Sequence, residues 1–356
     1  MDVAVIGGGI NGVMTAWELQ KLGHNISLFE KNNLMVNTSS ASSKLLHGGL
    51  RYLENYEFRL VKEALRERHW WISNAPQHTK PLKIFIPIYK KSRRPAFIYK
   101  VGLWLYDFLA GVENIGTHES YTKRQIQQSC PELKTEQLMK GFSYYDGVMD
   151  DYKLGLWAAE QAKKIGMKVY EQTLIDKIDL NGNVYLENRG KKSFDRIINV
   201  AGPWSQHLLE KSDVPLEYTL DLVRGSHIVV ERPLEHGYFL EIPNERRIFF
   251  VLPYNNKTLI GTTEKRQQLS EKIEVSDEEI DYLIIAYNQY FKNSLNRNDI
   301  ITTFSGVRPL IKSSHNPNKA TREYAIQTNN KITSVFGGKW TTSRKLAKNV
   351  VKSVLR

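Results

Sequence analysis

The segment from Thr38 to Glu54, TSSASSKLLHGGLRYLE, gathers side chains that can bind or transform a ligand. It contains several hydroxyl groups, Lys44, His47, a glycine pair and the dipeptide Arg51-Tyr52. Side chains this small and polar contribute little to a hydrophobic core. We therefore expect the segment to line a ligand site, and the residues before it indicate which ligand.

A glycine fingerprint lies at the N-terminus, where the apolar run DVAVI is followed by Gly7-Gly8-Gly9-Ile10-Asn11-Gly12. An apolar run of this length suits a buried parallel strand, and GxGxxG after such a strand is typical of dinucleotide-binding folds. Gly7 permits the tight turn, Gly9 lets the backbone approach a pyrophosphate, and Gly12 lets the next helix pack closely on the sheet. The sequence therefore predicts a strand, a turn and a helix that bind a dinucleotide.

An acidic residue at the end of the second predicted strand supports this interpretation. The run from Asn25 to Phe29 predicts that strand, and Glu30 follows it directly. A carboxylate there accepts hydrogen bonds from a ribose 2'-hydroxyl and repels a 2'-phosphate, which disfavours NADP. A glycine-rich turn without a ligand is the alternative, but it gives the acid no role.

Composition excludes several classes of protein. The chain has 356 residues, of which 41% are hydrophobic and 25% charged, as in an ordinary globular protein that is long enough for two domains. Cys130 is the only cysteine, which excludes an intramolecular disulfide, a CxxC redox pair and a cysteine-ligated iron–sulfur cluster. The nine histidines form no metal-binding motif such as HExxH, so we expect no catalytic metal. We also expect no secretory signal and no spanning helix, because no basic leader precedes the first apolar run and no apolar run reaches about 18 residues.

An excess of basic residues, 50 Lys and Arg against 38 Asp and Glu, gives a formal net charge of +12. Such a charge attracts anions: a phosphorylated metabolite, an anionic membrane surface or nucleic acid. Nucleic acid is the weakest of the three, because no recognised binding motif accompanies the charge. The region from Lys80 to Lys100 is rich in basic and aromatic residues and runs into the apolar stretch from Val101 to Leu109. This pattern is typical of an interfacial membrane anchor, but also of a helix packed on the core after a solvated basic loop.

The elements that position these residues predict two domains. Arg196 to Val200 predicts a buried strand that leads into Ala201-Gly202-Pro203, and Thr333 to Phe336 predicts another that leads into Gly337-Gly338. Between them, β-branched and alternating runs predict a separate sheet. We therefore expect an α/β fold in which residues 1–80, 150–210 and 330–356 form a Rossmann-like cofactor domain. Residues 81–149 and 211–329 are expected to form a strand-rich α+β substrate domain.

Six motifs that follow one another along the chain carry a resemblance to a known family. They are SSASSKLLHGGLRYLE, VAGPWS, RGSHIVV, IGTTE, FSGVRPL and FGGKWTTSRKLA. Together they resemble the FAD-dependent glycerol-3-phosphate dehydrogenases, two-domain flavoproteins of the D-amino acid oxidase type, and the resemblance covers essentially the whole chain. It implies FAD as the cofactor and oxidation of the C2 hydroxyl of sn-glycerol 3-phosphate to dihydroxyacetone phosphate, with hydride transfer to flavin N5.

The resemblance also implies a substrate site. The family's substrate-site cations correspond to Arg51, Arg308, Arg322 and Lys339, and its other polar positions to Tyr52 and His227. We expect Arg51 and Arg322 to hold the phosphate, because a planar guanidinium forms paired hydrogen bonds with it. Arg308 and Lys339 are expected nearer the C2 oxygen. His227 is the candidate general base, because its unperturbed pKa lies near the working pH.

Each of these residues also has an interpretation without a ligand. A single arginine such as Arg308 can pair with the sheet, and Lys339 can be a solvated residue before a helix. A histidine in a strand, such as His227, is more often a hydrogen-bonded core residue than a base, and Tyr52 beside an apolar helix can simply be packed. The motifs favour the site because they occur together and in order.

A cofactor site built from the same motifs is implied as well. The expected pyrophosphate and ribose contacts are Gly7, Gly9, Gly12 and Glu30. The expected lining of the diphosphate and flavin is Ser39, Ser40, Ser43 and the turn Leu46-His47-Gly48-Gly49. The residues expected beside the adenosine half are Ala201, Gly202 and Pro203, and those expected at the isoalloxazine are Gly337, Gly338, Lys339, Thr341 and Thr342. The helix after Thr342 would direct its N-terminal amides, and hence a partial positive charge, toward the flavin.

The expected partners follow from the resemblance. A membrane quinone is the expected electron acceptor, with direct reduction of oxygen as the alternative. We expect a cytoplasmic protein bound peripherally to the inner face of the cytoplasmic membrane, through Lys90 to Leu109 and more weakly through the terminal helix. Bacterial respiratory members continue into a further helical domain, which we expect to be absent because the chain ends at Arg356.

The sequence leaves two other classes of function open. The same fold can oxidise another small hydroxy acid or an amine, although several clustered cations favour a phosphate over a single carboxylate. A flavin-binding or assembly protein without catalysis is the other possibility. It predicts bound FAD that no substrate reduces.

Overall fold

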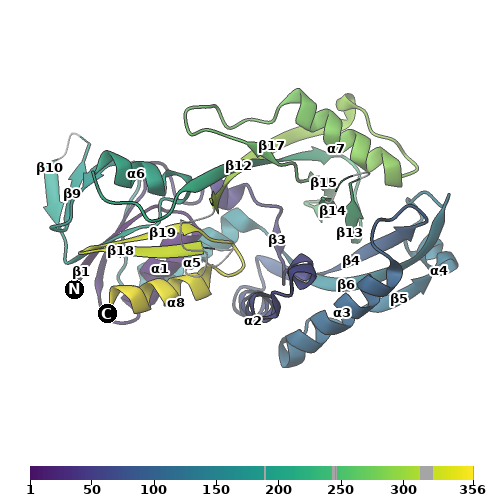
Figure 1. The fold of residues 1–356 in the computed structure, drawn as a ribbon, viewed down its shortest axis with the longest axis horizontal. Helices are drawn as coiled ribbons and strands as arrows, with labels where there is room; N and C mark the ends of the chain where they lie inside the picture. Colours follow the sequence, from purple (N-terminus) through teal and green to yellow (C-terminus); the bar gives the residue numbers. More distant parts are fainter. Residues whose placement is uncertain (188–189, 243–244, 246, 313–323, 356) are drawn as a thin grey trace.

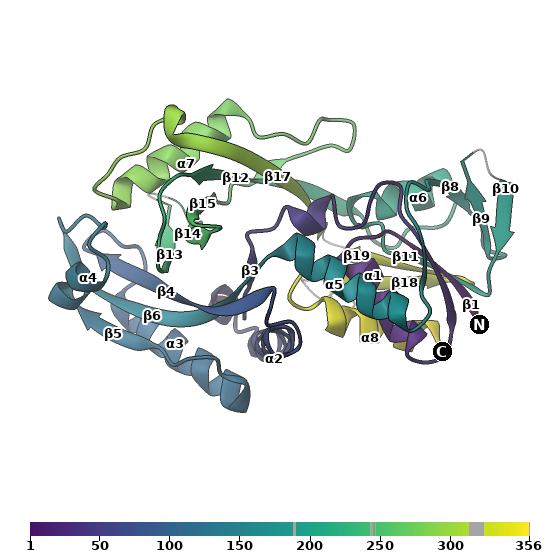
Figure 2. The ribbon, with the colours of Figure 1, turned by 180° about the vertical axis from the view of Figure 1, so that it is seen from behind.

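The fold consists of two main β-sheets that lie side by side, each covered by helices (Figure 1). The computed structural model describes residues 1–187, 190–242, 245, 247–312 and 324–355. Both chain termini lie at the outer end of the smaller, six-stranded sheet (Figures 1 and 2). The junction between the two sheets is therefore formed by internal parts of the chain.

The six-stranded sheet is built from segments that lie far apart in the sequence. Its strands run in the order β18-β19-β11-β1-β2-β7, and all neighbours are parallel except β18 and β19. The strands are β1 (Asp2–Ile6), β2 (Asn25–Phe29), β7 (Lys168–Tyr170), β11 (Arg196–Asn199), β18 (Tyr324–Asn329) and β19 (Ile332–Gly337). β1 lies inside the sheet because its small and branched apolar side chains are buried on both faces.

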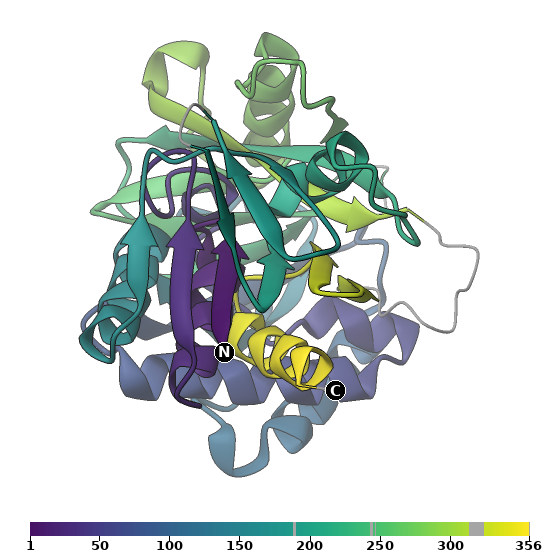
Figure 3. The ribbon, with the colours of Figure 1, turned by 90° about the vertical axis from the view of Figure 1, so that its left-hand side faces the viewer.

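Successive side chains of β1 point to opposite faces of the sheet, so both faces need cover. Val3 and Val5 pack against α1 (Ile10–Gln20), α5 (Asp151–Lys164) and α8 (Ser343–Val354). Ala4 and Ile6 pack toward α6 (Ser205–Lys211) and a small sheet of β8 (Ile175–Ile178), β9 (Asn183–Leu186) and β10 (Gly190–Ser193). Figure 3, which views the molecule from this end, shows the yellow α8 close to the purple N-terminal strand.

The ten-stranded sheet runs in the order β16-β12-β15-β14-β13-β4-β6-β3, with β17 paired to β12 and β5 paired to β6. Its strands are β3 (Leu45–Leu46), β4 (Thr79–Tyr89), β5 (Glu119–Thr122), β6 (Leu138–Met149), β12 (Leu220–Val230), β13 (Gly237–Glu241), β14 (Ile248–Tyr254), β15 (Lys257–Gly261), β16 (Lys265–Arg266) and β17 (Ile300–Ile311). α4 (Lys123–Ser129) and α7 (Asp277–Tyr290) pack on one face, and α2 (Phe58–Asn74) and α3 (Ala96–Ala110) on the other (Figure 2). The short 3-10 helices are η1 (Thr38–Ser40), η2 (Leu50–Asn55), η3 (Gly111–Glu113), η4 (Gly202–Trp204) and η5 (Arg297–Asp299).

The sheets confirm the predicted fold class, an α/β fold with a Rossmann-like sheet made of discontinuous segments. Two strands belong to a different sheet from the one that the expected domain boundaries assign them to. β3 joins the larger sheet although it lies within residues 1–80, and β18 joins the smaller sheet although it lies within residues 211–329. We therefore propose that the last part of the cofactor domain begins at Tyr324, where β18 starts.

Candidate active site

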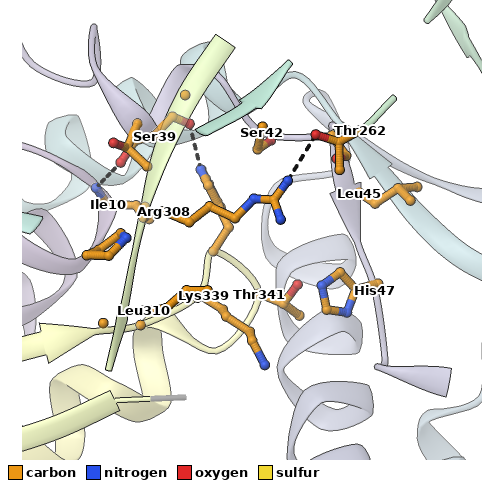
Figure 4. A pocket seen from close by; sticks show the side chains of 18 of the residues that line it. Ile10, Ser39, Ser42, Leu45, His47, Thr262, Arg308, Leu310, Lys339 and Thr341 are labelled. Atoms are coloured by element: carbon orange, nitrogen blue, oxygen red, sulfur yellow. Dashed lines mark hydrogen bonds between the residues drawn. The ribbon is translucent and has the colours of Figure 1, made fainter. Parts of the chain in front are cut away.

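A cavity of about 1640 Å³ is lined by residues from both main sheets (Figure 4). Small-molecule sites usually occupy about 300–1,000 Å³, so this cavity has room for a dinucleotide together with a smaller molecule. We call one part of its lining the glycine wall: Gly7, Gly9, Glu30, Ser39, Ala201, Gly202 and Pro203. We call another part the cationic wall: Arg51, Tyr52, His227, Thr262, Glu264, Arg308 and Lys339.

The turn before α1 forms the base of the glycine wall. Gly7 and Gly9 line the cavity, whereas Gly12 lies inside the helix and does not. A Cβ atom at Gly12 would overlap the carbonyl oxygen of Gly7, so the helix packs this closely on the turn only because residue 12 is glycine. The N-terminal end of α1, with its partial positive charge, therefore reaches the cavity.

Glu30, directly after β2, lies beside this turn. Its carboxylate accepts hydrogen bonds from Gly8 N at 2.6 Å and from Asn32 N at 2.9 Å. The residue is buried from solvent but lines the cavity. Each carboxylate oxygen can accept more than one hydrogen bond, so Glu30 can also bind the ribose hydroxyls that the sequence predicts.

Ser39 joins three distant parts of the chain beside the cavity. Its hydroxyl oxygen accepts a hydrogen bond from Ile10 N at 2.9 Å, and its carbonyl oxygen accepts one from Trp340 Nε1 at 2.9 Å. Figure 4 shows the bond between Ser39 and Ile10. The glycine turn, the serine segment and the turn after β19 therefore meet at one residue of the glycine wall.

A buried ion pair shapes the rest of the serine segment. Lys44 Nζ lies 2.6 Å from Asp151 Oδ1 and donates to the carbonyl oxygen of Ser40 at 2.7 Å. Ser42 Oγ donates to the other carboxylate oxygen of Asp151 at 2.6 Å. Ser42 and Ser43 line the cavity, whereas the predicted contact Ser40 does not. The ion pair thus helps to determine which serines of this segment line the cavity.

The glycine wall fits a bound dinucleotide. The side-chain oxygen of Asn11 is buried at the cavity and has no hydrogen-bond partner among the described residues. Buried polar atoms without a partner are rare unless a ligand, an ion or water satisfies them. With the close approach that Gly7 and Gly9 allow and the carboxylate of Glu30, this environment suits the diphosphate and ribose of FAD.

Arg308 on β17 is the central cation of the cationic wall. Its Nη2 donates to Thr262 Oγ1 at 2.9 Å, and its Nη1 lies 3.5 Å from Glu264 Oε1 (Figure 4). Burial lowers the pKa of Arg308, the neighbouring arginines lower it further, and Glu264 raises it. Arginine stays protonated in proteins despite such shifts. Arg308 therefore presents a fixed and partly desolvated positive charge.

Two glycines create the space for functional side chains. β12 pairs with β17 so that Val223 lies opposite Arg308, and Gly225 lies beside the guanidinium. A Cβ atom at Gly225 would overlap Nη2 of Arg308, and one at Gly261 would overlap the imidazole of His227. The glycine of RGSHIVV therefore leaves space for the Arg308 side chain, and the glycine of IGTTE leaves space for the His227 side chain.

His227 on β12 is 2% exposed, and its ring stacks on Phe304 at a centroid distance of 4.8 Å. Its Nε2 lies 2.9 Å from Ser43 Oγ, and its Nδ1 has no hydrogen-bond partner within the described part of the chain. Burial, followed by the positive charges of Arg308 and Lys44, lowers the pKa of His227 to about 3. The pKa in the folded protein therefore lies well below the unperturbed value from which His227 was selected as a candidate base, and the ring is neutral at pH 7.

Arg51 and Tyr52 lie on η2, which follows Gly49 in the left-handed conformation with a φ of 78°. The Tyr52 amide donates to the carbonyl oxygen of Gly49 at 2.8 Å. Lys339 Nζ lies 4.0 Å from the centre of the Tyr52 ring, which is a cation–π contact. Arg51 is exposed and lines the cavity, and no described residue forms an ion pair with it. Its guanidinium is thus accessible to an anion in the cavity.

Most of the predicted site residues line the same cavity. These are Gly7, Gly9, Glu30, Ser39, Ser43, His47, Gly49, Arg51, Tyr52, Ala201, Gly202, Pro203, His227, Arg308, Gly337, Gly338, Lys339 and Thr341. The predicted residues that lie behind the lining are Gly12, Ser40, Leu46, Gly48 and Thr342. Leu46 on β3 is buried in the protein interior, because neighbouring side chains on a strand point in opposite directions. Thr342, at the start of α8, is buried as well. Arg322 falls outside the described residues, so its role stays a prediction.

Some residues of the site have no role that the motifs alone reveal. Thr262 and Glu264 belong to IGTTE and contact Arg308. Glu264 Oε2 also lies 3.3 Å from Arg247 Nε, so one carboxylate bridges two guanidinium groups. Asp146 on β6 lines the cavity and lies outside all the motifs. The motif IGTTE is a signal for the first two, whereas nothing in the sequence around Asp146 distinguishes it.

Comparison with known proteins identifies the family. The family described as "FAD dependent oxidoreductase" matches residues 2–344. The chain is 40% identical over 368 residues to a glycerol-3-phosphate dehydrogenase of Pseudomonas tolaasii, which covers 98% of this chain and 70% of that protein. It is 37% identical over 363 residues to a D-erythritol 1-phosphate dehydrogenase of Brucella abortus, which covers 97% of this chain and 72% of that protein.

A solved structure agrees with both the fold and the cofactor. It is a glycerol-3-phosphate dehydrogenase from Bacillus halodurans complexed with FAD, which is 26% identical to this chain with a TM-score of 0.80. The match covers 99% of this chain and spans 64% of that one. FAD is therefore the cofactor, and the glycine wall provides the groups that fit it. The chain belongs to the family of FAD-dependent oxidoreductases that includes the glycerol-3-phosphate dehydrogenases.

Proposed function

We propose that the protein oxidises the C2 hydroxyl of sn-glycerol 3-phosphate to the ketone of dihydroxyacetone phosphate and passes the electrons to a membrane quinone. The observation that carries the proposal is the meeting of Arg51, Arg308 and Lys339 with the glycine wall in one cavity. The name of a relative at 40% identity agrees with it. Bound FAD supplies the two-electron acceptor at this site.

The cationic wall suits a phosphate dianion. Thr262 and Glu264 hold Arg308, so its guanidinium is in place before a substrate binds. Arg51 has no ion pair with a described residue, so binding a phosphate breaks no such pair. We assign the phosphate to Arg51 and to Arg322, which lies outside the described residues. Arg308 and Lys339 are assigned to the region of the C2 oxygen.

His227 remains our candidate base, for a different physical reason. In the free protein its imidazole is neutral, because burial and the charges of Arg308 and Lys44 lower its pKa to about 3. A phosphate dianion held by Arg51, whose charge acts on Arg308, partly compensates the positive charge around the imidazole and raises its proton affinity. His227 therefore becomes a stronger base when the substrate is bound. Ser43, whose hydroxyl lies 2.9 Å from Nε2, holds the ring in one orientation.

Anaerobic titration tests the substrate assignment. The purified protein should show the yellow absorption of oxidised flavin, and glycerol 3-phosphate without NAD should bleach it. Glycerol and inorganic phosphate are the controls, because each carries only one part of the substrate and should leave the band oxidised. A flavin band that glycerol 3-phosphate leaves unchanged would overturn the proposal.

D-Erythritol 1-phosphate is a second candidate substrate, because a relative named for it is 37% identical to this chain. The cavity of about 1640 Å³ has room for the additional carbon and hydroxyl. The same titration decides between the two compounds. The better substrate is the one with the higher ratio of limiting reduction rate to half-saturating concentration.

An exposed apolar face on α3 supports binding to a membrane surface. Phe97, Ile98, Val101, Trp104 and Phe108 recur at helical spacing and are between 44% and 70% exposed. Aromatic and apolar side chains next to the basic loop that precedes this helix suit the interface of an anionic bilayer. Among the described residues, no helix combines the length and the apolar character needed to cross a bilayer. We propose that this face rests on the inner surface of the cytoplasmic membrane.

The cavity itself reaches α3, which bears on the electron acceptor. Its lining includes Tyr56, just after η2, and Phe97 and Val101 of α3. The cavity therefore borders the face that we propose to contact lipid. This arrangement suits an acceptor dissolved in the membrane, and we propose a quinone on this ground.

Cosedimentation with phosphatidylglycerol vesicles tests the membrane surface. Replacing both Trp104 and Phe108 by serine should strongly reduce binding, because it removes an exposed, stacked aromatic pair from the helix. Ile285→Ser is the matched control, since Ile285 is 61% exposed on α7, on the other face of the sheet. Equal binding of the double variant and the wild-type protein would contradict the assignment of this surface.

Reoxidation identifies the acceptor. After reduction with glycerol 3-phosphate, a soluble quinone analogue should restore the flavin band much faster than dissolved oxygen does. The opposite order would identify an oxidase.

A further inference from the structure

A buried ionic cluster lies beside the cavity and has no part in the chemistry described so far. It consists of Arg68 on α2, Tyr106 on α3 and Asp146 on β6, each of them at most 2% exposed. Asp146 Oδ1 accepts hydrogen bonds from the Tyr106 hydroxyl at 2.6 Å and from Arg68 Nη1 at 2.9 Å. Two helices therefore converge on one carboxylate of the larger sheet.

The same carboxylate oxygen holds the backbone of the glycine pair. The Gly48 amide donates to Asp146 Oδ1 at 2.9 Å. A Cβ atom at Gly48 would overlap the Tyr106 hydroxyl and the Leu65 side chain, so the chain runs in direct contact with the cluster. A hydrogen bond from an amide to a buried carboxylate is charge-assisted and stronger than one between neutral groups. Gly48 is thus the point at which this turn is tied to the protein interior.

From Gly48 the chain leads directly to two side chains of the cationic wall. Gly49 accepts the Tyr52 amide through its carbonyl oxygen at 2.8 Å, at the start of η2. Arg51 and Tyr52 lie on η2, and none of the residues of this 3-10 helix is buried. Leu50, Tyr52 and Leu53 of η2 pack, partly buried, against the core of the larger sheet. The Gly48 contact with Asp146 is the fully buried, charge-assisted hydrogen bond just before the start of this helix.

We propose that Asp146 is a positioning residue of the substrate site, which holds the Gly48 amide and thereby sets where Arg51 and Tyr52 stand. The proposal rests on the proposed function for the role of those two side chains. Tyr106 and Arg68 orient the carboxylate, and Arg68 also balances its charge.

The ion pair determines how the proposal can be tested. Arg68 Nη1 pairs with Asp146, whereas its Nε and Nη2 have no hydrogen-bond partner in the described part of the chain. Removing the carboxylate alone would leave a buried cation unpaired, and such a variant can simply fail to fold. A useful variant must therefore spare the ion pair or remove both of its charges.

Two variants meet that requirement. Tyr106→Phe removes one donor to Asp146 and leaves the ion pair in place. The double variant Arg68→Met/Asp146→Leu removes both charges together with the acceptor of the Gly48 amide, and buried pairs replaced in this way often keep their fold. Tyr290→Phe is the matched control, because it removes a tyrosine hydroxyl that donates to a backbone carbonyl at 2.6 Å outside the cavity lining.

Hydrogen exchange measures how firmly Asp146 holds the Gly48 turn, and it needs no substrate. In the FAD-loaded proteins, the peptide covering residues 45–55 should exchange moderately faster in Tyr106→Phe and much faster in the double variant than in the wild-type protein. Tyr290→Phe should leave this peptide unchanged. Unchanged exchange in the double variant would overturn the proposal, because other contacts would then hold the turn.

The kinetics of flavin reduction by glycerol 3-phosphate test whether Arg51 and Tyr52 are correctly positioned. The half-saturating concentration should rise by roughly fivefold in Tyr106→Phe, the fold-change that corresponds to one ordinary hydrogen bond, and by more in the double variant. The limiting rate should change little, because the interactions lost act equally on substrate and transition state. Faster exchange with an unchanged half-saturating concentration would overturn the positioning role.

Failure of the proposed function would look different. If glycerol 3-phosphate does not reduce the wild-type flavin, inorganic phosphate takes its place, and its binding is followed by the shift it causes in the flavin band. Weaker phosphate binding in the double variant than in the wild-type protein would still support Asp146 as the positioning residue. Equal phosphate binding in the two proteins would overturn it.

Discussion

The two walls of the cavity are built in opposite ways. The glycine wall is mainly backbone, and its N-terminal turn is held by residues of the same region of the chain: Glu30 accepts the Gly8 amide, 22 residues away, and Ser39 accepts the Ile10 amide, 29 residues away. The cationic wall is made of charged side chains from distant segments, as the contact between Arg308 on β17 and the loop after β15 shows. In the glycine wall, the glycines themselves line the cavity. In the cationic wall, glycines leave space for the side chains of neighbouring residues.

This difference determines which changes each wall tolerates. Where backbone is the binding surface, even an added methyl group alters the site. Where single side chains bind the ligand, truncating one of them removes affinity and leaves the surrounding structure in place. Variants on the two walls should therefore separate FAD content from substrate turnover.

Gly12→Ala should have the largest effect, because it should abolish FAD binding. The added Cβ atom would overlap the carbonyl oxygen of Gly7 and push α1 away from the turn. We expect a colourless and inactive protein, measured as the ratio of flavin to protein absorbance. Gly102→Ala is the control, since a Cβ atom there meets no neighbour. Normal FAD content in Gly12→Ala would contradict the idea that the glycine wall tolerates no added methyl group.

Arg308→Gln should lower kcat/KM for flavin reduction by roughly 10²–10³-fold while FAD content stays normal. The estimate corresponds to two charge-assisted hydrogen bonds of about 1.5–2 kcal/mol each. Arg308→Lys should recover only part of the loss, because lysine keeps the charge but lacks the planar fork. Loss of FAD from Arg308→Gln would show that the walls depend on each other.

Arg51→Ala should have a smaller effect on the same wall, roughly a 10- to 100-fold rise in KM. Arg51 is exposed, so its charge acts through a higher effective dielectric constant than that of Arg308. Arg59→Ala, at another exposed arginine outside the cavity lining, is the matched control and should keep the wild-type KM. An unchanged KM in Arg51→Ala would remove this residue from the phosphate site.

The pH dependence of stability should show the smallest effect and would sharpen the comparison, because burial and the positive charges of Arg308 and Lys44 keep His227 neutral. The folded pKa is about 3, and the unfolded value is roughly 6.5, so the unfolded chain binds one more proton between these values. The free energy of unfolding should therefore be highest above roughly pH 6.5 and fall, by up to about 1.4 kcal/mol per pH unit from this group, as the pH drops toward 3. Denaturant unfolding at pH 5 and pH 7 should show a steeper loss in the wild-type protein than in His227→Asn. Equal pH dependence in the two proteins would mean that the imidazole is not kept neutral.

The parts of the site that could be predicted from the sequence are those in which neighbours in the chain are also neighbours in space. The fingerprint from Gly7 to Glu30 is one strand, one turn, one helix and one further strand, so its spacing reveals its structure. The placement of Arg308 against Thr262 could not be predicted, because it depends on the pairing register of β12 with both β15 and β17. Asp146 was missed for the same reason: its contact with Gly48 joins residues 98 positions apart.

Motifs also do not show in which direction a side chain points or whether it is buried. Leu46 lies within the predicted flavin turn but points into the core, whereas His47 beside it lines the cavity. The lowered pKa of His227 could not be predicted from the sequence, because it comes from burial and from Arg308 and Lys44, which reach it from other segments. A residue type gives the unperturbed pKa, and only the fold gives the actual one.

The hydrogen bonds of Ser39 have a consequence for the order in which the protein is assembled. Its carbonyl oxygen binds the Trp340 indole, a residue 301 positions later in the chain, and β19 just before that residue pairs with β11. Contacts between such distant positions form late, because a long stretch of chain must first be made and ordered. During synthesis the N-terminal fingerprint is therefore made long before the last strands of its sheet. We therefore expect stable loading of FAD only after Trp340 has emerged from the ribosome.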